Sequence, residues 1–306
     1  MPIGDSPLGT TACRLLGLPV QVTSPTELLP TTYDALAAWS GSNTGSGAEL
    51  DVLLTLDRNL AGCDDVVLTP HGDTLHLDSH GAIGVADGAR HSAAVRVSPD
   101  YIGKPSRMRE QLLEPMLLFL AGHAGRTPIH AAGIVANGLA ILLAGPSGSG
   151  KSCLALAAQE AGFGLLSDDT VYVQLQPRLA VWGAPNPIHV FAEDAIGRYG
   201  TPRLRNGKRK IGIATRSHAP GPIRRITPCR IQRGDAVRLE RTSPAEAMAM
   251  FDHPEPGFDL FRPHIFRVGQ RITARGAWRL TLGRDPAAAI ALIQHRIGEL
   301  HAGAVA

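Results

Sequence analysis

Residues 145–152, with the sequence GPSGSGKS, combine glycines, hydroxyl groups and a lysine at a spacing that could bind the phosphates of a nucleotide. They fit the pattern G-x-x-x-x-G-K-[ST], in which glycines let the backbone wrap a phosphate so that its N–H groups point inward. Lys151 would add positive charge at the outer phosphates, and the Ser152 hydroxyl would hold Mg²⁺. We therefore predict that the chain binds ATP with Mg²⁺. The residues expected to contact the nucleotide are Gly145, Ser147, Gly148, Ser149, Gly150, Lys151, Ser152 and Cys153.

The segments on either side of this loop have the structure that a phosphate site requires. Residues 139–144 (LAILLA) form a continuous apolar run that is short enough for a buried strand. Residues 153–161 are rich in good helix formers, and Gly162 follows them as a C-cap. The positive end of such a helix would face the bound anion. A flexible Gly/Ser turn that happens to precede a lysine is the alternative, and the two flanks argue against it.

A second candidate element is the pair of carboxylates Asp168 and Asp169. They directly follow residues 163–167, a short apolar run that predicts a strand one crossover after the loop. In a parallel sheet this strand would lie beside the loop strand, with its carboxyl end at the phosphates. A solvated turn is the alternative reading of two adjacent aspartates, and their position after the strand favours a functional role.

The sequence before the loop predicts a β-hairpin. Residues 129–136 form a strand candidate, and Asn137-Gly138 separates them from the loop strand. Asn-Gly between two apolar runs is a strong hairpin signal, because both turn residues need positive φ. His130 and Gly145 lie seven residues on either side of that turn, so we expect them to face each other near the outer phosphate.

Together these motifs resemble the nucleotide core of HPr kinase/phosphorylase and its relatives, whose fold is related to that of phosphoenolpyruvate carboxykinase. The resemblance covers residues 128–175 with specific motifs and residues 223–295 loosely. It implies that Asp169 acts as base on a serine hydroxyl, that His130 is its neighbour and that Lys151 supplies charge at the phosphates. It further implies that Ser152 and Asp168 hold Mg²⁺. The implied fold is an α/β phosphate-loop core with a smaller β-rich N-terminal domain.

The sequence departs from the HPr enzymes after Asn186-Pro187. Bacterial HPr enzymes carry Glu-Ile-Arg-Gly there, whereas this chain continues with residues 188–193, IHVFAE. The layout is more similar to the HPr-kinase-like enzymes of lasso-peptide gene clusters, which phosphorylate a serine of a precursor peptide. A peptide or protein bearing a serine is therefore the expected partner. A small-molecule or HPr-type kinase, or a nucleotide-binding regulator without turnover, remains an alternative; a regulator would need no base such as Asp169.

The chain divides into a β-rich N-terminal domain, residues 1–125, and a kinase domain, residues 126–306. Short apolar or alternating runs between residues 48 and 97 predict a small, mostly antiparallel sheet. The histidines in it lack the spacing of metal ligands. A capping box at residues 24–27 predicts a helix start, residues 33–39 could form a helix, and residues 106–120 predict a helix despite Pro115.

The C-terminal third adds further elements. Residues 203–210 hold five basic residues and are either a solvated loop or an anion-gathering segment. Residues 223–239 predict one or two strands, the capping box at residues 243–246 opens a helix, and residues 278–282 predict a strand. A last helix follows Asp285-Pro286. Its apolar stripe consists of Ile290, Ile293, Ile297 and Leu300.

Composition limits the class of protein. A net charge of +3 is too small to indicate a dedicated nucleic-acid binder, and no apolar run is long enough to cross a membrane. The four cysteines form no C-x-x-C pair, which argues against a disulfide framework and a zinc site. The N-terminus lacks the pattern of a signal peptide, so we expect a cytoplasmic protein. A homo-oligomer is compatible with the sequence.

Overall fold

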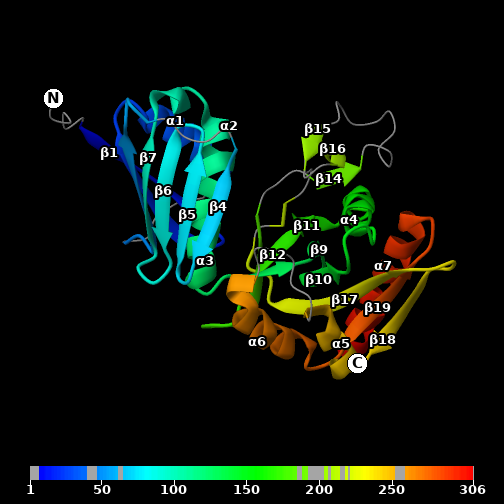
Figure 1. Ribbon diagram of the computed structural model, residues 1–306. Helices are drawn as coiled ribbons and strands as arrows, with labels where there is room; N and C mark the ends of the chain where they lie inside the picture. Colours follow the sequence, from blue (N-terminus) through cyan, green and yellow to red (C-terminus); the bar gives the residue numbers. More distant parts are fainter. Residues whose placement is uncertain are drawn as a thin grey trace. The chain divides into compact units, whose positions relative to one another are not determined.

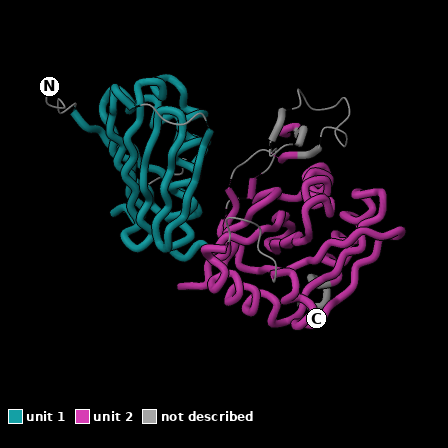
Figure 2. Tube along the Cα trace, viewed as in Figure 1, with its two compact units in different colours: residues 1–126 teal, residues 127–306 magenta. Residues whose placement is uncertain are grey.

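The computed structural model describes residues 7–39, 47–60, 65–184, 188–191, 203–205, 208–213, 218–219, 221–251 and 259–305. The chain forms two compact units, Met1–Arg126 and Thr127–Ala306 (Figure 2). Strands and helices occur in both units, and the first is dominated by a sheet, so the expected α/β class with a β-rich N-terminal region is confirmed.

Unit 1 is a seven-stranded sheet in the order β1-β2-β3-β7-β6-β5-β4, with α1 and α3 packed against it (Figure 1). Buried and exposed residues alternate along β3, β5 and β7, as expected for strands with one covered face. The sheet is mostly antiparallel, as predicted, although β3 pairs in parallel with both neighbours. The strands are β1 (Leu8–Leu15), β2 (Leu18–Pro25), β3 (Leu50–Leu56), β4 (Val67–His71), β5 (Thr74–Ser79), β6 (Ala82–Asp87) and β7 (Ser92–Val97).

The first forty residues differ from the sequence prediction. The predicted capping box at residues 24–27 is wrong, because Ser24 is fully buried and pairs with Gly9 inside the β1–β2 hairpin. Helix α1 (Leu29–Leu36) begins later, with Pro30 in its first turn, and a 3₁₀ turn (Ala37–Trp39) follows it. Pairing with a neighbouring strand therefore overrides a local helix signal at this position.

The helix predicted over residues 106–120 is present in three consecutive pieces. An α-helical turn, α2 (Pro105–Met108), leads into a π-helical segment (Arg109–Leu113) and then α3 (Glu114–His123). Pro115 lacks an N–H and cannot complete an ordinary helical hydrogen bond. The wider π turn just before it lets the helix continue past the proline.

Unit 2 contains a six-stranded sheet in the order β11-β9-β10-β17-β19-β18 and two three-stranded sheets, β13-β12-β8 and β14-β16-β15. Its strands are β8 (Thr127–His130), β9 (Ala132–Ala136), β10 (Leu139–Ala144), β11 (Gly164–Ser167), β12 (Thr170–Gln174), β13 (Ala180–Gly183), β14 (Ile188–Phe191), β15 (Arg203–Arg205), β16 (Lys208–Ile213), β17 (Arg225–Arg233), β18 (Arg238–Thr242) and β19 (Ala277–Leu282). Its helices are α4 (Lys151–Glu160), α5 (Pro244–Met248), α6 (Arg262–Thr273) and α7 (Pro286–Val305), with 3₁₀ turns at Ala249–Phe251 and Asp259–Phe261.

The core of unit 2 lies around β10, which is buried at every position and therefore on both faces. Helices α4 and α7 pack together over one side of the sheet, with Ile290, Ile293 and Ile297 buried as predicted. Helix α6 packs against β17 and β8 outside that cluster. The capping box Ser243–Glu246 is present at the start of α5, and Asp285 Oδ1 accepts the N–H of Ala287 at the start of α7.

The Asn137-Gly138 hairpin is confirmed, with φ of 50° and 71° at its two turn residues and β9 paired to β10. The single strand predicted over residues 129–136 is wrong, however. The chain bends at Ala131, whose N–H bonds to Ile129 O at 2.8 Å, and β8 leaves for another sheet. The predicted pairing of His130 with Gly145 is therefore wrong, because the hairpin ladder ends one residue beyond that bend.

The strand before the two aspartates also has a different neighbour from the one predicted. Strand β11 pairs with β9, which lies between it and the loop strand β10. The hairpin occupies that edge of β10, so β11 can join only on its far side. Because β9 is antiparallel to both, β10 and β11 point the same way, and their carboxyl ends still lie at the same edge of the sheet.

Two further predictions meet the structure only in part. The basic run at residues 203–210 covers β15 and the first three residues of β16, so it is not a plain loop; its side chains lie outside the described residues. Of residues 188–193, where the sequence departs from the HPr enzymes, residues 188–191 form β14, and residues 192–193 lie outside the described part of the chain. Within the described ranges, no helix is both long and apolar enough to cross a membrane.

Candidate functional site

The phosphate loop joins the end of β10 to the start of α4, as the sequence predicts. Two of its glycines, Gly148 and Gly150, have positive φ, and Gly150 is the N-cap of α4. Lys151 begins the helix and is only 7% exposed. Its Nζ donates to Gly145 O at 2.7 Å and to Pro146 O at 3.3 Å, so the ammonium group lies across the start of the loop.

Close packing explains why glycine is needed at two of these positions. A Cβ at Gly150 would lie 2.7 Å from Leu282 Cδ2, and its φ of 105° disfavours any other residue. A Cβ at Gly145 would lie 2.9 Å from Ser149 Oγ and 3.0 Å from the carbonyl oxygen of Ile231. The loop is therefore held tightly between β10 and the neighbouring strands.

A buried hydroxyl within the loop supports anion binding. Ser149 is 5% exposed, and its Oγ has no hydrogen-bond partner among the residues that the structure describes. Buried polar groups are normally paired, so an orphaned donor beside a helix N-terminus fits a phosphate oxygen. Ser147 and Gly148 are exposed, and Ser152 and Cys153 are partly exposed in the first turn of α4.

The two aspartates occupy different environments at the end of β11. Asp168 is 4% exposed, and its Oδ2 accepts the backbone N–H of His189 at 2.7 Å. The Asp169 side chain is 70% exposed. Between β11 and β12 the turn is fixed by Ser167 Oγ, which accepts the N–H groups of Asp169 and Thr170 at 3.3 and 3.2 Å. One carboxylate is thus held inside the protein, while the other faces solvent.

His130 lies beside Asp169, with Nδ1 3.6 Å from Oδ1, and its side chain is 18% exposed. The structure reaches this arrangement through a pairing that the sequence did not suggest. Strand β8 pairs with β12, which places His130 opposite Thr170, the residue after Asp169. The predicted neighbours are therefore brought together by the three-stranded sheet and not by the hairpin.

Sequence reasoning missed Arg233, which reaches the loop from the carboxyl end of β17. Its Nη2 lies 3.5 Å from Gly148 O, and its guanidinium is beside Gly150. The parallel pairing of β17 with β10 places it there. No local pattern around residue 233 signals this role, because the pairing joins segments about ninety residues apart.

The donor set suits Mg²⁺ better than a metal held by a full protein cage. Among the described residues, no three His, Cys, Asp or Glu side chains are grouped to hold a metal ion. Mg²⁺ commonly uses one or two protein oxygens together with water and phosphates. Ser152 and Asp168 offer such oxygens from adjacent elements, the first turn of α4 and the end of β11.

No family model and no curated protein matches the sequence. Among solved structures, the Hpr(Ser) kinase/phosphatase from Coxiella burnetii is similar to part of the chain, with a TM-score of 0.33 and 13% identity. The match covers 57% of this chain and 98% of that one.

Proposed function

We propose that this protein is an ATP-dependent kinase that transfers the γ-phosphate to a serine hydroxyl of a peptide or protein. The observation that carries the proposal is the Asp169–His130 pair at the same sheet edge as the phosphate loop. A nucleotide-binding regulator would need the loop alone. An exposed carboxylate at the same sheet edge would supply the base that transfer to a hydroxyl requires.

In this proposal the loop binds the triphosphate through groups already in place. Backbone N–H groups, Ser149 Oγ and the N-terminus of α4 would meet the phosphate oxygens, and Lys151 and Arg233 would add positive charge. Ser152 and Asp168 would hold Mg²⁺, which when bound neutralises charge on the phosphates. The hydrogen bond from His189 N–H fixes Asp168 so that its carboxylate needs little reorganisation.

The acceptor hydroxyl would approach the exposed face of Asp169. As the serine oxygen forms a bond to the γ-phosphorus, the bond from that phosphorus to the ADP oxygen breaks, and Asp169 takes the hydroxyl proton. His130 lies within 3.6 Å of the carboxylate and would orient it. Positioned groups of this kind supply most of the catalysis in phosphoryl transfer.

The exposure of Asp169 favours a macromolecular acceptor over a small molecule. Small-molecule sites usually enclose their ligand, whereas 70% of this side chain faces solvent. The motif resemblance narrows the proposal to the serine of a precursor peptide of the lasso-peptide type. A small-molecule or HPr-type kinase is the alternative on the same core.

The test is single-turnover transfer from labelled ATP to serine-containing peptides, with Asp169→Asn as the variant. The substitution keeps size and polarity but removes the base, so transfer should fall by about 10²–10⁴-fold while ATP affinity is unchanged. Asp259→Asn, an exposed carboxylate elsewhere in unit 2, is the matched control. Near-native transfer by the Asp169→Asn variant would place the base elsewhere and refute the proposed mechanism.

A further inference from the structure

Unit 2 has two adjoining cavities away from the phosphate loop, with volumes of about 820 Å³ and 500 Å³. They share Leu179, Arg271 and Ala274, so we treat them as one feature, the arginine groove. Seven arginines and no aspartate or glutamate line it. The arginines are Arg178, Arg224, Arg225, Arg241, Arg267, Arg271 and Arg275.

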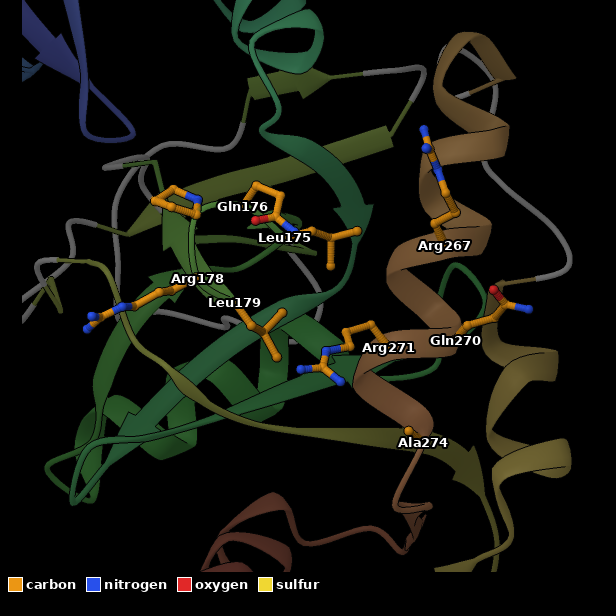
Figure 3. A pocket seen from close by; sticks show the side chains of 9 residues that line it. Leu175, Gln176, Arg178, Leu179, Arg267, Gln270, Arg271 and Ala274 are labelled. Carbon is orange, nitrogen blue, oxygen red and sulfur yellow. The ribbon is translucent and has the colours of Figure 1, made fainter.

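One wall of the groove is a stripe along α6. Arg267, Gln270, Arg271 and Ala274 lie on the face that looks into the first cavity, and Arg271 extends toward Leu179 (Figure 3). Arg275 continues the stripe just past the helix end. From Arg267 to Arg275 the helical rise covers about 12 Å. The opposite face of α6 is buried, so the arginine stripe is held facing the groove.

The other wall comes from the β12–β13 turn, residues 175–179, and from the starts of neighbouring strands. Arg178, Arg271 and Arg275 form no ion pair with any carboxylate in the described part of the chain. Exposed arginines of one sign gathered along a groove create a positive potential that favours an anionic ligand. Their planar guanidinium groups suit carboxylates in particular.

The groove is separate from the nucleotide site. Its floor includes Leu139 and Ala277, the first residues of β10 and β19, whereas the phosphate loop follows the last residue of β10. The two features therefore lie at opposite edges of the six-stranded sheet. Strand β12 connects them, because it begins next to Asp169 and ends next to Leu175. The six residue steps from Asp169 to Leu175 span roughly 20 Å in extended chain.

We propose that the arginine groove binds an acidic segment of a peptide. A linear row of arginines over more than one helical turn matches a chain that repeats carboxylates, and exceeds what a single phosphate would contact. Single-stranded nucleic acid would need exposed aromatic rings for stacking. Trp278 is the aromatic residue in the lining, and it is 4% exposed. The assignment of this acidic segment to the phosphate acceptor rests on the proposed kinase function. Binding of an acidic peptide by the groove does not depend on that function.

Fluorescence anisotropy of a labelled eight-residue oligoglutamate peptide, at low and high salt and without nucleotide, tests the groove. Reversing two charges with Arg271→Glu and Arg275→Glu should weaken binding at least about tenfold, because like charges then face each other. The matched control is Arg238→Glu with Arg284→Glu, two exposed arginines near the other edge of the sheet. It makes the same change in net charge and should keep the affinity.

Equal affinity of both double variants, or no binding by the unaltered protein, would overturn the proposal. An oligonucleotide of equal length and charge that binds more tightly and responds to the same variants would assign the groove to nucleic acid and overturn it too. Lys151→Ala should leave peptide binding intact, so failure of the groove and failure of the nucleotide site are distinguishable.

The acceptor role has its own test in the kinase assay. Serine peptides with an acidic block should be phosphorylated best when about six or more residues separate the serine from the block, since that length spans from Asp169 to the groove. Equal rates at every spacing, together with normal transfer, would show that the groove does not bind the phosphate acceptor.

Discussion

The two edges of the six-stranded sheet in unit 2 are built in different ways. At the carboxyl edge the charged groups Lys151 and Asp168 are buried and hydrogen-bonded to the backbone, and tight glycine packing fixes the loop. At the amino edge the arginines are exposed and extend from several elements. Buried, preorganised groups suit the binding of phosphates and a metal ion, whereas exposed charges, including Asp169, suit contact with a flexible ligand.

The largest expected effect, at the carboxyl edge, comes from Lys151→Ala. Removing the one buried ammonium group of the loop should reduce phosphate transfer by roughly 10³-fold or more, whatever the charge of the acceptor. Single-turnover transfer to acidic and neutral serine peptides measures this. Lys104→Ala, an exposed lysine of unit 1, is the control, and circular dichroism checks the fold. A loss of transfer restricted to acidic peptides would show that Lys151 recognises the acceptor. The two edges of the sheet would then not differ in function.

A smaller effect is expected from His130→Ala. An interaction with a charged group contributes about 1.5 kcal/mol, so transfer should fall roughly tenfold. A double-mutant cycle with Asp169→Asn distinguishes a merely structural role of His130 from an effect on the Asp169 carboxylate. If His130 acts through the carboxylate, its removal should cost almost nothing once Asp169 is already Asn. An undiminished loss in that background would show that His130 works independently of Asp169.

The smallest effect concerns two cysteines of unit 2, one after the phosphate loop and one in the core of the sheet. Cys153 is partly exposed in the first turn of α4, whereas Cys229 on β17 is fully buried, and burial raises its pKa to about 12. At pH 8 the Cys229 thiol is then almost entirely protonated, whereas the thiolate is the reactive form. Mass spectrometry after iodoacetamide treatment should find Cys153 modified and Cys229 intact. Saturating ATP with Mg²⁺ should slow only the Cys153 reaction, and an unchanged rate would argue that the nucleotide binds elsewhere.

Local sequence was sufficient for the central elements of the site. The strand at residues 139–144, the glycine loop and the helix from Lys151 follow from short-range rules of burial, φ preference and helix propensity. The Asn137-Gly138 turn and the capping box at Ser243 are equally local, because each depends on a few neighbouring residues. Even the strand before Asp168 was predicted correctly, although its neighbour was not.

Only the tertiary structure decided which strands lie side by side. It placed β9 between β10 and β11, paired β8 with β12 so that His130 meets Asp169, and paired β17 with β10 so that Arg233 reaches the loop. The arginine groove likewise gathers arginines from positions 178 to 275 that share no motif. Periodicity fixes which face of a strand is buried, but the choice of partner depends on how distant segments close around a common core. Residues adjacent in the sequence therefore determine the chemistry of the loop. Contacts between distant segments determine which groups surround it.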